Sequence, residues 1–284
     1  MKLSKIFALL LALCLISSAA CAATFTDAHG NVIELDDSLE AYAAVTLVGA
    51  DNAARQGETN LGDLWADALR WFAVSGEINA AFDEDDVKAG NDRIAVDADH
   101  VVALWNGGNL RADIAEGTFG AEALAEVLPF PNKVAVVYMT GAQLLETLEA
   151  ASQGLPYTAE TADACASLMQ VSGLAYTVDT TKAYDALEAY GDHWFTAGSV
   201  SRVSISDVNG QPFDETATYA VVTSNANFNG MDSSYVFKTA AEENELSAVT
   251  VAVVRDVVFR FIAAELNHQV GEAYAAPQGR LTIL

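Results

Sequence analysis

Residues 101–111 read V-V-A-L-W-N-G-G-N-L-R, a short apolar run that stops abruptly at a glycine-rich loop. An apolar run of this length, bounded by turn residues, is typical of one buried strand. A strand that ends in glycines exposes backbone and side chains where a ligand can reach them. Asn106 can both donate and accept a hydrogen bond there, and Arg111 can bind a phosphate or a diol. The sequence therefore predicts a strand followed by a binding loop.

Helical and strand patterns alternate irregularly on both sides of this stretch. Helices are predicted at residues 61–72 (capped by Thr59 or Asn60), 121–127, 142–151 and 248–266. Strands are predicted at residues 133–139, 168–178, 200–205 and 219–223, with a possible hairpin at 24–35. Because the elements mix without strict βαβ alternation, we predict an α+β fold, a single domain of mixed β-sheets with packed helices.

The composition indicates a globular, strongly acidic protein. The chain has 284 residues, 14 Lys and Arg against 39 Asp and Glu, a formal net charge of −25 and 52% hydrophobic residues. This apolar fraction excludes a disordered tail protein. The charge argues against nucleic acid and anionic membrane surfaces as partners. If the protein binds an anion, a few local arginines must do so against the overall field.

The first residues are typical of a secretory signal peptide. Lys2 and Lys5 precede an apolar run at residues 6–16, and small residues follow. We expect a signal peptide at 1–22, an N-terminal segment at 23–45, one domain at 46–284, and export to the periplasm or the extracellular space. Lipidation at Cys21 is the less favoured alternative, because Ser18 stands where lipoprotein signals usually carry Leu. No later segment is apolar enough to predict a membrane span.

Cysteine counting predicts no disulfide in the mature chain. Cys14 and Cys21 lie in or at the end of the predicted signal peptide, so Cys165 stands alone. A lone cysteine is more often a small packed side chain than a nucleophile.

Several short motifs follow one another in a distinctive order. They are R-Q-G-E-T-N-L-G-D-L at 55–64, N-G-G-N-L-R at 106–111, V-L-P-F at 127–130, Q-V-S-G-L at 170–174, Y-A-V-V at 219–222, G-M-D at 230–232 and G-R-L at 279–281. This series resembles the C-terminal, substrate-specificity domain of the 5′-nucleotidase and UDP-sugar hydrolase family. The resemblance runs from about residue 46 to the end of the chain and implies the fold of that domain.

The resemblance also implies a nucleotide or nucleoside site. Arg55 matches an arginine that helps to hold the nucleotide, and Arg111 one that contacts ribose or phosphate. Phe130 matches one side of an aromatic clamp on the base, and Asp232 an acid that accepts from ribose hydroxyls. The substrate-binding residues implied in this way are Arg55, Asn106, Gly108, Arg111, Phe130 and Asp232.

The chain departs from the family pattern at three places. Ala226 falls where the family has its second stacking Phe, and Phe228 could replace that Phe only if the loop is shifted. Asn109 stands in place of a third glycine. The segment around Asp232 reads G-M-D-S-S-Y instead of G-G-D-G-Y. The second aromatic side chain of the clamp is thus not assigned to a residue of this sequence.

Each of these residues also has a simpler interpretation. Phe130 could belong to the core, and the arginines could be surface partners of the many acids. Gly108 and its neighbour could serve only a turn, and Asp232 could cap local backbone. These interpretations do not explain why the residues occur together in family order.

The metal chemistry of the family is not evident in this sequence. That chemistry needs two metals with several His ligands, and the chain has four His residues. Residues 27–30 read D-A-H-G and 191–193 read G-D-H, which echo family metal motifs without the rest of a ligand set. Residues 30–54 are too few for a metallophosphatase domain. We therefore expect no metal site, no cofactor and no catalytic residue here.

The leading hypothesis is an exported nucleotide- or nucleoside-binding domain of the 5′-nucleotidase family. It would serve nucleotide hydrolysis together with a separately encoded, metal-dependent metallophosphatase chain, and would not hydrolyse nucleotides alone. The alternative is an interaction or structural module that kept the fold and lost its ligand. A third hypothesis is a complete enzyme with a degenerate site.

Overall fold

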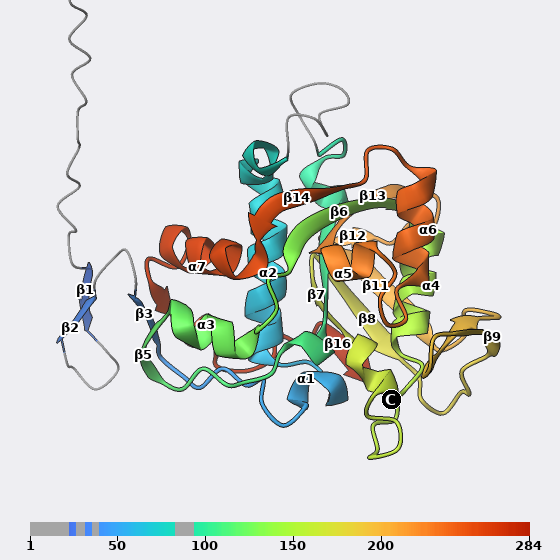
Figure 1. Ribbon diagram of the computed structural model, residues 1–284, viewed down its shortest axis with the longest axis horizontal. Coiled ribbons are helices and arrows are strands. Elements are labelled where there is room, and N and C mark those ends of the chain that lie inside the picture. The colour runs from blue at the N-terminus through green and yellow to red at the C-terminus, as the bar shows by residue number, and fades with distance from the viewer. Residues whose placement is uncertain (1–22, 27–31, 36–39, 83–93) are drawn as a thin grey trace, which may run out of the picture.

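The computed structural model describes residues 23–26, 32–35, 40–82 and 94–284, and its centre is a mixed five-stranded sheet (Figure 1). In spatial order the strands are β14 (Ala248–Val253), β6 (Lys133–Thr140), β13 (Thr218–Ser224), β4 (Val101–Asn106) and β7 (Met169–Ser172). Strand β13 is parallel to β4, whereas the other pairs are antiparallel. The mixture of strand directions confirms the α+β fold class.

Both faces of this sheet are buried, which explains the continuous apolar runs of its strands. In β4, Val101, Ala103 and Trp105 belong to one hydrophobic core. Val102 and Leu104, which point the opposite way, belong to a second core. Because successive strand residues face opposite sides, an uninterrupted apolar strand is what a sheet between two cores requires.

Helices cover the two faces of the sheet (Figure 1). The first core contains residues of α2 (Asn60–Val74), α7 (Val254–Ala264) and α3 (Ala121–Val127). The second contains residues of α4 (Gly141–Ala151) and α6 (Tyr235–Glu243). Helix α2 begins where the sequence predicts, because the Thr59 side chain accepts a hydrogen bond from Gly62 N at 3.0 Å.

Smaller sheets surround the central one. One of them has four strands in the order β12 (Gln211–Pro212), β11 (Val203–Val208), β8 (Leu174–Val178) and β16 (Leu281–Ile283). The C-terminal strand β16 lies at its edge and runs parallel to β8. Strand β3 (Glu40–Ala43), from the segment set apart as N-terminal, pairs with β5 (Gly117–Gly120) and β15 (Gln269–Val270). Two further antiparallel pairs stand apart: β1 (Ala23–Thr26) with β2 (Val32–Leu35), and β9 (Ala186–Tyr190) with β10 (Trp194–Ala197).

Most predicted elements are confirmed, and three predictions need correction. The strand predicted at 200–205 is displaced, because β11 begins at Val203 and ends at Val208. The helix predicted over residues 248–266 is wrong in its first third, because residues 248–253 form strand β14 against β6 and the helix begins only at Val254. The run A-V-T-V-A-V is rich in β-branched residues, which favour a strand once an edge is available. The strand predicted at 168–178 is two strands, broken at Gly173 with φ +81°. The predicted hairpin at 24–35 has paired strands, and its connecting residues lie outside the described part.

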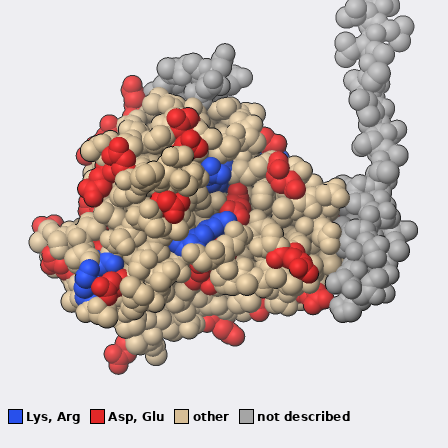
Figure 2. All heavy atoms as spheres, turned by 180° about the vertical axis from the view of Figure 1, so that it is seen from behind, with Lys and Arg blue, Asp and Glu red and all other residues tan. Residues whose placement is uncertain are grey.

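The surface agrees with the acidic composition. On the face shown in Figure 2, acidic side chains are scattered over the surface and basic side chains are few. Cys165 is buried and free, as expected of a packed side chain. Within the described residues, no helix combines the length and the apolarity needed to cross a bilayer.

Candidate functional site

A hollow of about 200 Å³ lies at the end of strand β4, where the predicted binding loop begins. We call it the site hollow. Predicted site residues on its wall are Arg55, Asn106, Gly108, Arg111 and Asp232. The rest of the wall comes from Asn109, Asp163, Ala166, His193 and Trp194. Segments far apart in the sequence are thus brought together in one place.

Arg55 lies at the end of the short helix α1 (Ala53–Gln56) and is almost buried, with 9% of its surface exposed. Its Nη1 donates to the carbonyl of Ala162 at 2.8 Å. The same nitrogen lies 3.6 Å from Asp163 Oδ1, a carboxylate that is largely exposed. Arg55 is therefore held in place by the chain, and its ion pair is a weak one facing water.

Arg111 is held only through its backbone. Its amide donates to Val127 O at 2.9 Å, which fixes the binding loop to the segment that carries Phe130. Among the described residues, its guanidinium makes no hydrogen bond or salt bridge, and it lies over the Phe130 ring at 5.9 Å. Burial, and then repulsion from Arg55, lower the pKa of Arg111, and the charge of Asp232 opposes this without cancelling it. The site hollow thus contains a cation that forms no salt bridge within the described residues.

Phe130 is the one predicted residue outside the wall of the site hollow. Its side chain is 44% exposed, so the interpretation of Phe130 as a core residue is wrong. Its contact with Arg111 places it at the edge of the hollow. An exposed aromatic ring beside a cation can offer its face to a planar ligand.

Asn106 and Asp232 face each other across the hollow. Asn106 is 3% exposed, and its Nδ2 donates to Asp232 Oδ2 at 3.5 Å. Its Oδ1 accepts from Asn109 Nδ2 at 2.8 Å, so the residue that replaces the family's third glycine already satisfies the Asn106 oxygen. The Asn106 amide thus has a partner at both its oxygen and its nitrogen, and the second N–H of the nitrogen is the donor left to contact a ligand.

Asp232 occupies a left-handed backbone conformation, with φ 55°. Burial raises the pKa of Asp232, and the positive charges of Arg55 and Arg111 oppose this rise. Its carboxylate faces Asn106, so the interpretation of Asp232 as a local backbone cap is not supported. A carboxylate beside two arginines and an amide can accept hydrogen bonds from hydroxyl groups.

The two loop glycines are explained by close packing of the chain. A Cβ at Gly107 would lie 2.0 Å from Ala54 O, and one at Gly108 would lie 2.7 Å from Ala166 O and Cβ. Neither glycine has a positive φ. Close packing of the chain, rather than the approach of a ligand, therefore requires glycine at these two positions. They let α1 and the 3-10 turn η5 (Ala164–Ser167) pack on the binding loop.

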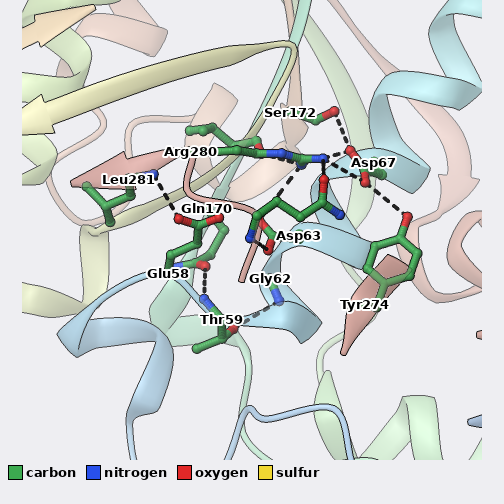
Figure 3. Close-up of polar contacts among 12 residues, drawn as sticks. Glu58, Thr59, Gly62, Asp63, Asp67, Gln170, Ser172, Tyr274, Arg280 and Leu281 are labelled. Carbon is green, nitrogen blue, oxygen red and sulfur yellow. Dashed lines mark hydrogen bonds and ion pairs between the residues drawn. The ribbon is translucent and has the colours of Figure 1, made fainter. Parts of the chain in front are cut away.

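Other family motifs stabilise the fold, and Figure 3 shows how they meet. Arg280 Nη2 donates to Asp67 Oδ2 at 2.9 Å, Nη1 lies 2.8 Å from Asp67 Oδ1, and Nη1 also donates to Val171 O at 2.8 Å. Glu58 Oε2 accepts from Leu281 N at 2.9 Å. The motifs at 55–64 and 279–281 therefore fasten the C-terminal strand to α2. We call Glu58, Asp63, Asp67, Tyr274 and Arg280 the Arg280 cluster.

Asp63 lies at the buried end of the Arg280 cluster, with no exposed surface. Its Oδ2 accepts from Gln278 N at 3.0 Å, whereas its Oδ1 and Glu58 Oε1 have no hydrogen-bond partner in the part of the chain that the structure describes. Burial, and then the charge of Glu58, raise the pKa of Asp63 to about 8. Such a shift often marks an active site, but here it belongs to a structural cluster away from the site hollow.

Trp194 was not among the residues predicted from the sequence, and His193 was noted only as part of a short resemblance to a family metal motif. Both lie on the β9–β10 hairpin and line the site hollow. Phe228, considered as a replacement for the missing second Phe, instead packs against the second core. Ala226 has no aromatic ring. Trp194 is an aromatic side chain of the site hollow that the family motifs do not indicate.

Within the described residues, no group of three or more His, Cys, Asp or Glu side chains is placed to hold a metal ion. Residues 27–30, which resemble a family metal motif, lie outside the described part of the chain. A larger hollow of about 500 Å³ lies between α3 and α7 and contains none of the predicted residues.

Comparison with known proteins gives a consistent result. Residues 40–241 match the family model described as 5′-nucleotidase, C-terminal domain. The chain is 29% identical over 212 residues to the trifunctional nucleotide phosphoesterase protein YfkN of Bacillus subtilis, of which it covers 12%. A 5′-nucleotidase precursor from Thermus thermophilus aligns with 86% of this chain at 27% identity and a TM-score of 0.61.

The fold is also shared with the NAD nucleotidase of Haemophilus influenzae, at 16% identity and a TM-score of 0.57 over 86% of this chain. These relatives are longer proteins. This chain spans 39% of the Thermus structure and 38% of the Haemophilus structure. The chain belongs to the 5′-nucleotidase C-terminal domain family, and it corresponds to the C-terminal domain portion of these larger nucleotidases.

Proposed function

We propose that this chain is an exported nucleotide- or nucleoside-binding domain whose ligand occupies the site hollow. The observation that carries the proposal is the Arg111 guanidinium, which lines the hollow and forms no hydrogen bond or salt bridge among the described residues. Arg55 lines the same hollow beside Asp163, and the charge of the partly buried Asp232 acts on both arginines. In a protein of net charge −25, an arginine without a salt bridge makes a local site for an anion.

The other residues suit the remaining parts of such a ligand. Phe130 exposes an aromatic face beside Arg111, which can stack on a base. Asp232 can accept hydrogen bonds from a ribose diol, and Asn106 can donate one from its amide. Gly108 contributes backbone to the wall of the hollow. The phosphate, the ribose and the base of a nucleotide thus each have side chains at the site that suit them.

The site hollow is smaller than most small-molecule sites. Its volume of about 200 Å³ falls below the usual range of about 300–1,000 Å³. A nucleotide would therefore extend beyond it. We propose further that a separate metal-dependent catalytic chain carries out hydrolysis while this domain holds the substrate. Export to the periplasm or the extracellular space rests on the signal-like first 22 residues.

The test is calorimetric titration of the mature protein with AMP and adenosine. Arg111→Ala should weaken AMP binding about tenfold, or 1.4 kcal/mol, because a charge-assisted contact is lost. Arg255→Ala is the matched control, since Arg255 lies on α7 and lines the other hollow. Its AMP dissociation constant should stay that of the wild type. An unchanged constant in Arg111→Ala would reject the assignment of Arg111.

The alternative function, a ligand-free interaction module, is favoured by one observation: Asn109 already satisfies the Asn106 oxygen. It predicts no heat of binding with either ligand and co-purification with a partner protein. A phosphate-release assay on the same sample, with added divalent metal, distinguishes the binding domain and the ligand-free module from a complete enzyme, because only the enzyme would release phosphate. Binding without phosphate release supports the proposed division of labour.

A further inference from the structure

The β9–β10 hairpin is a small ribbon that stands outside both hydrophobic cores. Its strands pair only with each other, and most residues of β9 are exposed. An isolated two-stranded ribbon is marginal in water, so other contacts must hold it in place. The position of this hairpin is therefore set by the residues to which it is fastened.

Three hydrogen bonds fasten the hairpin next to the site hollow. Tyr190 donates its hydroxyl to Gly230 O at 2.6 Å, two residues before Asp232. The amide of Phe195 donates to Gln153 Oε1 at 2.8 Å, and the amide of Ala197 donates to the Tyr235 hydroxyl at 2.9 Å. The hairpin is thus tied to the loop that carries Asp232 and to the start of α6.

Fastened in this way, the hairpin presents Trp194 to the site hollow. Trp194 is half-buried and lines the hollow together with Arg55, Arg111 and Asp232. The next residue, Phe195, does not line it and is 42% exposed. Because neighbouring strand residues point to opposite faces, one of these aromatic side chains faces the hollow and the other faces away.

The segment of residues 225–230 supplies no aromatic surface to the site. Ala226 has no ring, and Phe228 packs against the second core. Phe130 lies outside the wall of the hollow, beside Arg111. On the wall itself the described residues with rings are His193 and Trp194, and Trp194 has the larger π-face.

We propose that Trp194, carried by the β9–β10 hairpin, is the surface on the wall of the hollow on which the base of the nucleotide or nucleoside stacks, in addition to the face that Phe130 offers outside the wall. This inference rests on the proposed function and names the residue that recognises the base. An indole offers a large π-face to any base, so Trp194 favours ligands that carry a base over a bare sugar phosphate without selecting one base strongly.

The test compares AMP with ribose 5-phosphate, which keeps the sugar and phosphate and lacks the base. Trp194→Ala should weaken AMP binding about tenfold, as the loss of one stacked base implies, and should leave ribose 5-phosphate binding unchanged. Trp194→Phe should recover most of the AMP affinity. Phe195→Ala, on the same strand, is the matched control and should bind both ligands as the wild type does.

A second readout is the fluorescence of the tryptophans on titration with AMP. Trp65 and Trp105 are fully buried, so quenching that is lost in Trp194→Phe belongs to Trp194. AMP binding that is unchanged in Trp194→Ala would overturn the inference and leave the proposed function standing. Equal losses for both ligands would assign Trp194 a structural role and would also overturn it. If the wild type binds neither ligand, the proposed function fails, and this inference with it.

Discussion

Arg280 and Arg111 are the same residue type in two clusters with opposite electrostatic balance. Arg280 donates to Asp67, Val171 and Gln278, and its Nη1 lies 3.8 Å from Asp63. Burial alone would lower the pKa of Arg280, but the hydrogen bond and charge of Asp67, together with the charge of Asp63, outweigh it, so the net shift is upward. In Arg111, burial and the neighbouring Arg55 lower the pKa, and the charge of Asp232 is too weak to reverse the shift.

The difference separates a structural cation from a cation that is available for binding. The Arg280 cluster supplies the negative charge that its arginine needs. The site hollow brings Arg55 and Arg111 together with Asp163 and Asp232, and the Arg111 guanidinium forms no salt bridge with either acid, which leaves it available for a ligand. A protein that binds an anion must leave such a group incompletely paired, and the family motifs contribute to both clusters.

The largest effect is expected from breaking the structural cluster. Arg280→Ala should lower the free energy of unfolding by about 3 kcal/mol, because the mostly buried Asp67 carboxylate then loses the guanidinium that contacts both of its oxygens. Urea unfolding followed by circular dichroism measures this loss. Arg260→Ala is the control, because Arg260 is an exposed residue that pairs with Glu77, and it should cost about 0–1 kcal/mol. Equal, small losses in the two variants would contradict the structural role of Arg280.

Sequence patterns predicted the elements whose apolar period is unambiguous. The helix at 121–127 and the Thr59 cap were found because one apolar face and one capping side chain suffice to define them. Strand β14 at residues 248–253 was assigned to the following helix, although its β-branched side chains favour a strand, because the apolar pattern continues into that helix. The neighbouring strand β6, which decides the matter, lies more than 100 residues away in the sequence.

The candidate site was predicted from motifs, and its geometry was not. The resemblance named five residues that do line the site hollow. It could not name Trp194, because residues 186–197 have no apolar alternation and the hairpin is placed by Gly230, Gln153 and Tyr235. It also could not show that Gly108 packs against Ala166, a contact between segments distant in the sequence.

A second, smaller effect concerns the proton on Asp63. With the pKa of Asp63 raised to about 8 in the folded protein, folding takes up a proton between about pH 4 and pH 8. This contribution to stability is complete below about pH 4 and is lost as the pH rises toward about 8, with a slope of at most about 1.4 kcal/mol per pH unit.

Asp63→Asn should remove this pH dependence. The free energy of unfolding of the wild type, relative to Asp63→Asn, should therefore fall between pH 5 and about 8, as urea unfolding at several pH values will show. Asp256→Asn, at an exposed site on α7, controls for the general loss of one acid. Parallel pH profiles for the wild type and Asp63→Asn would mean that Asp63 is ionised in the folded protein.

The smallest expected effect on stability is at Arg111, and it sharpens the comparison most. Arg111→Ala should change the free energy of unfolding by less than about 0.5 kcal/mol, because its guanidinium has no hydrogen bond or salt bridge within the described residues. The same substitution should lower AMP affinity about tenfold. Loss of binding without loss of stability, set against the reverse in Arg280→Ala, would show that the chain keeps Arg111 for its ligand. A destabilisation near that of Arg280→Ala would instead make Arg111 a structural residue, and the site hollow would lose its free cation.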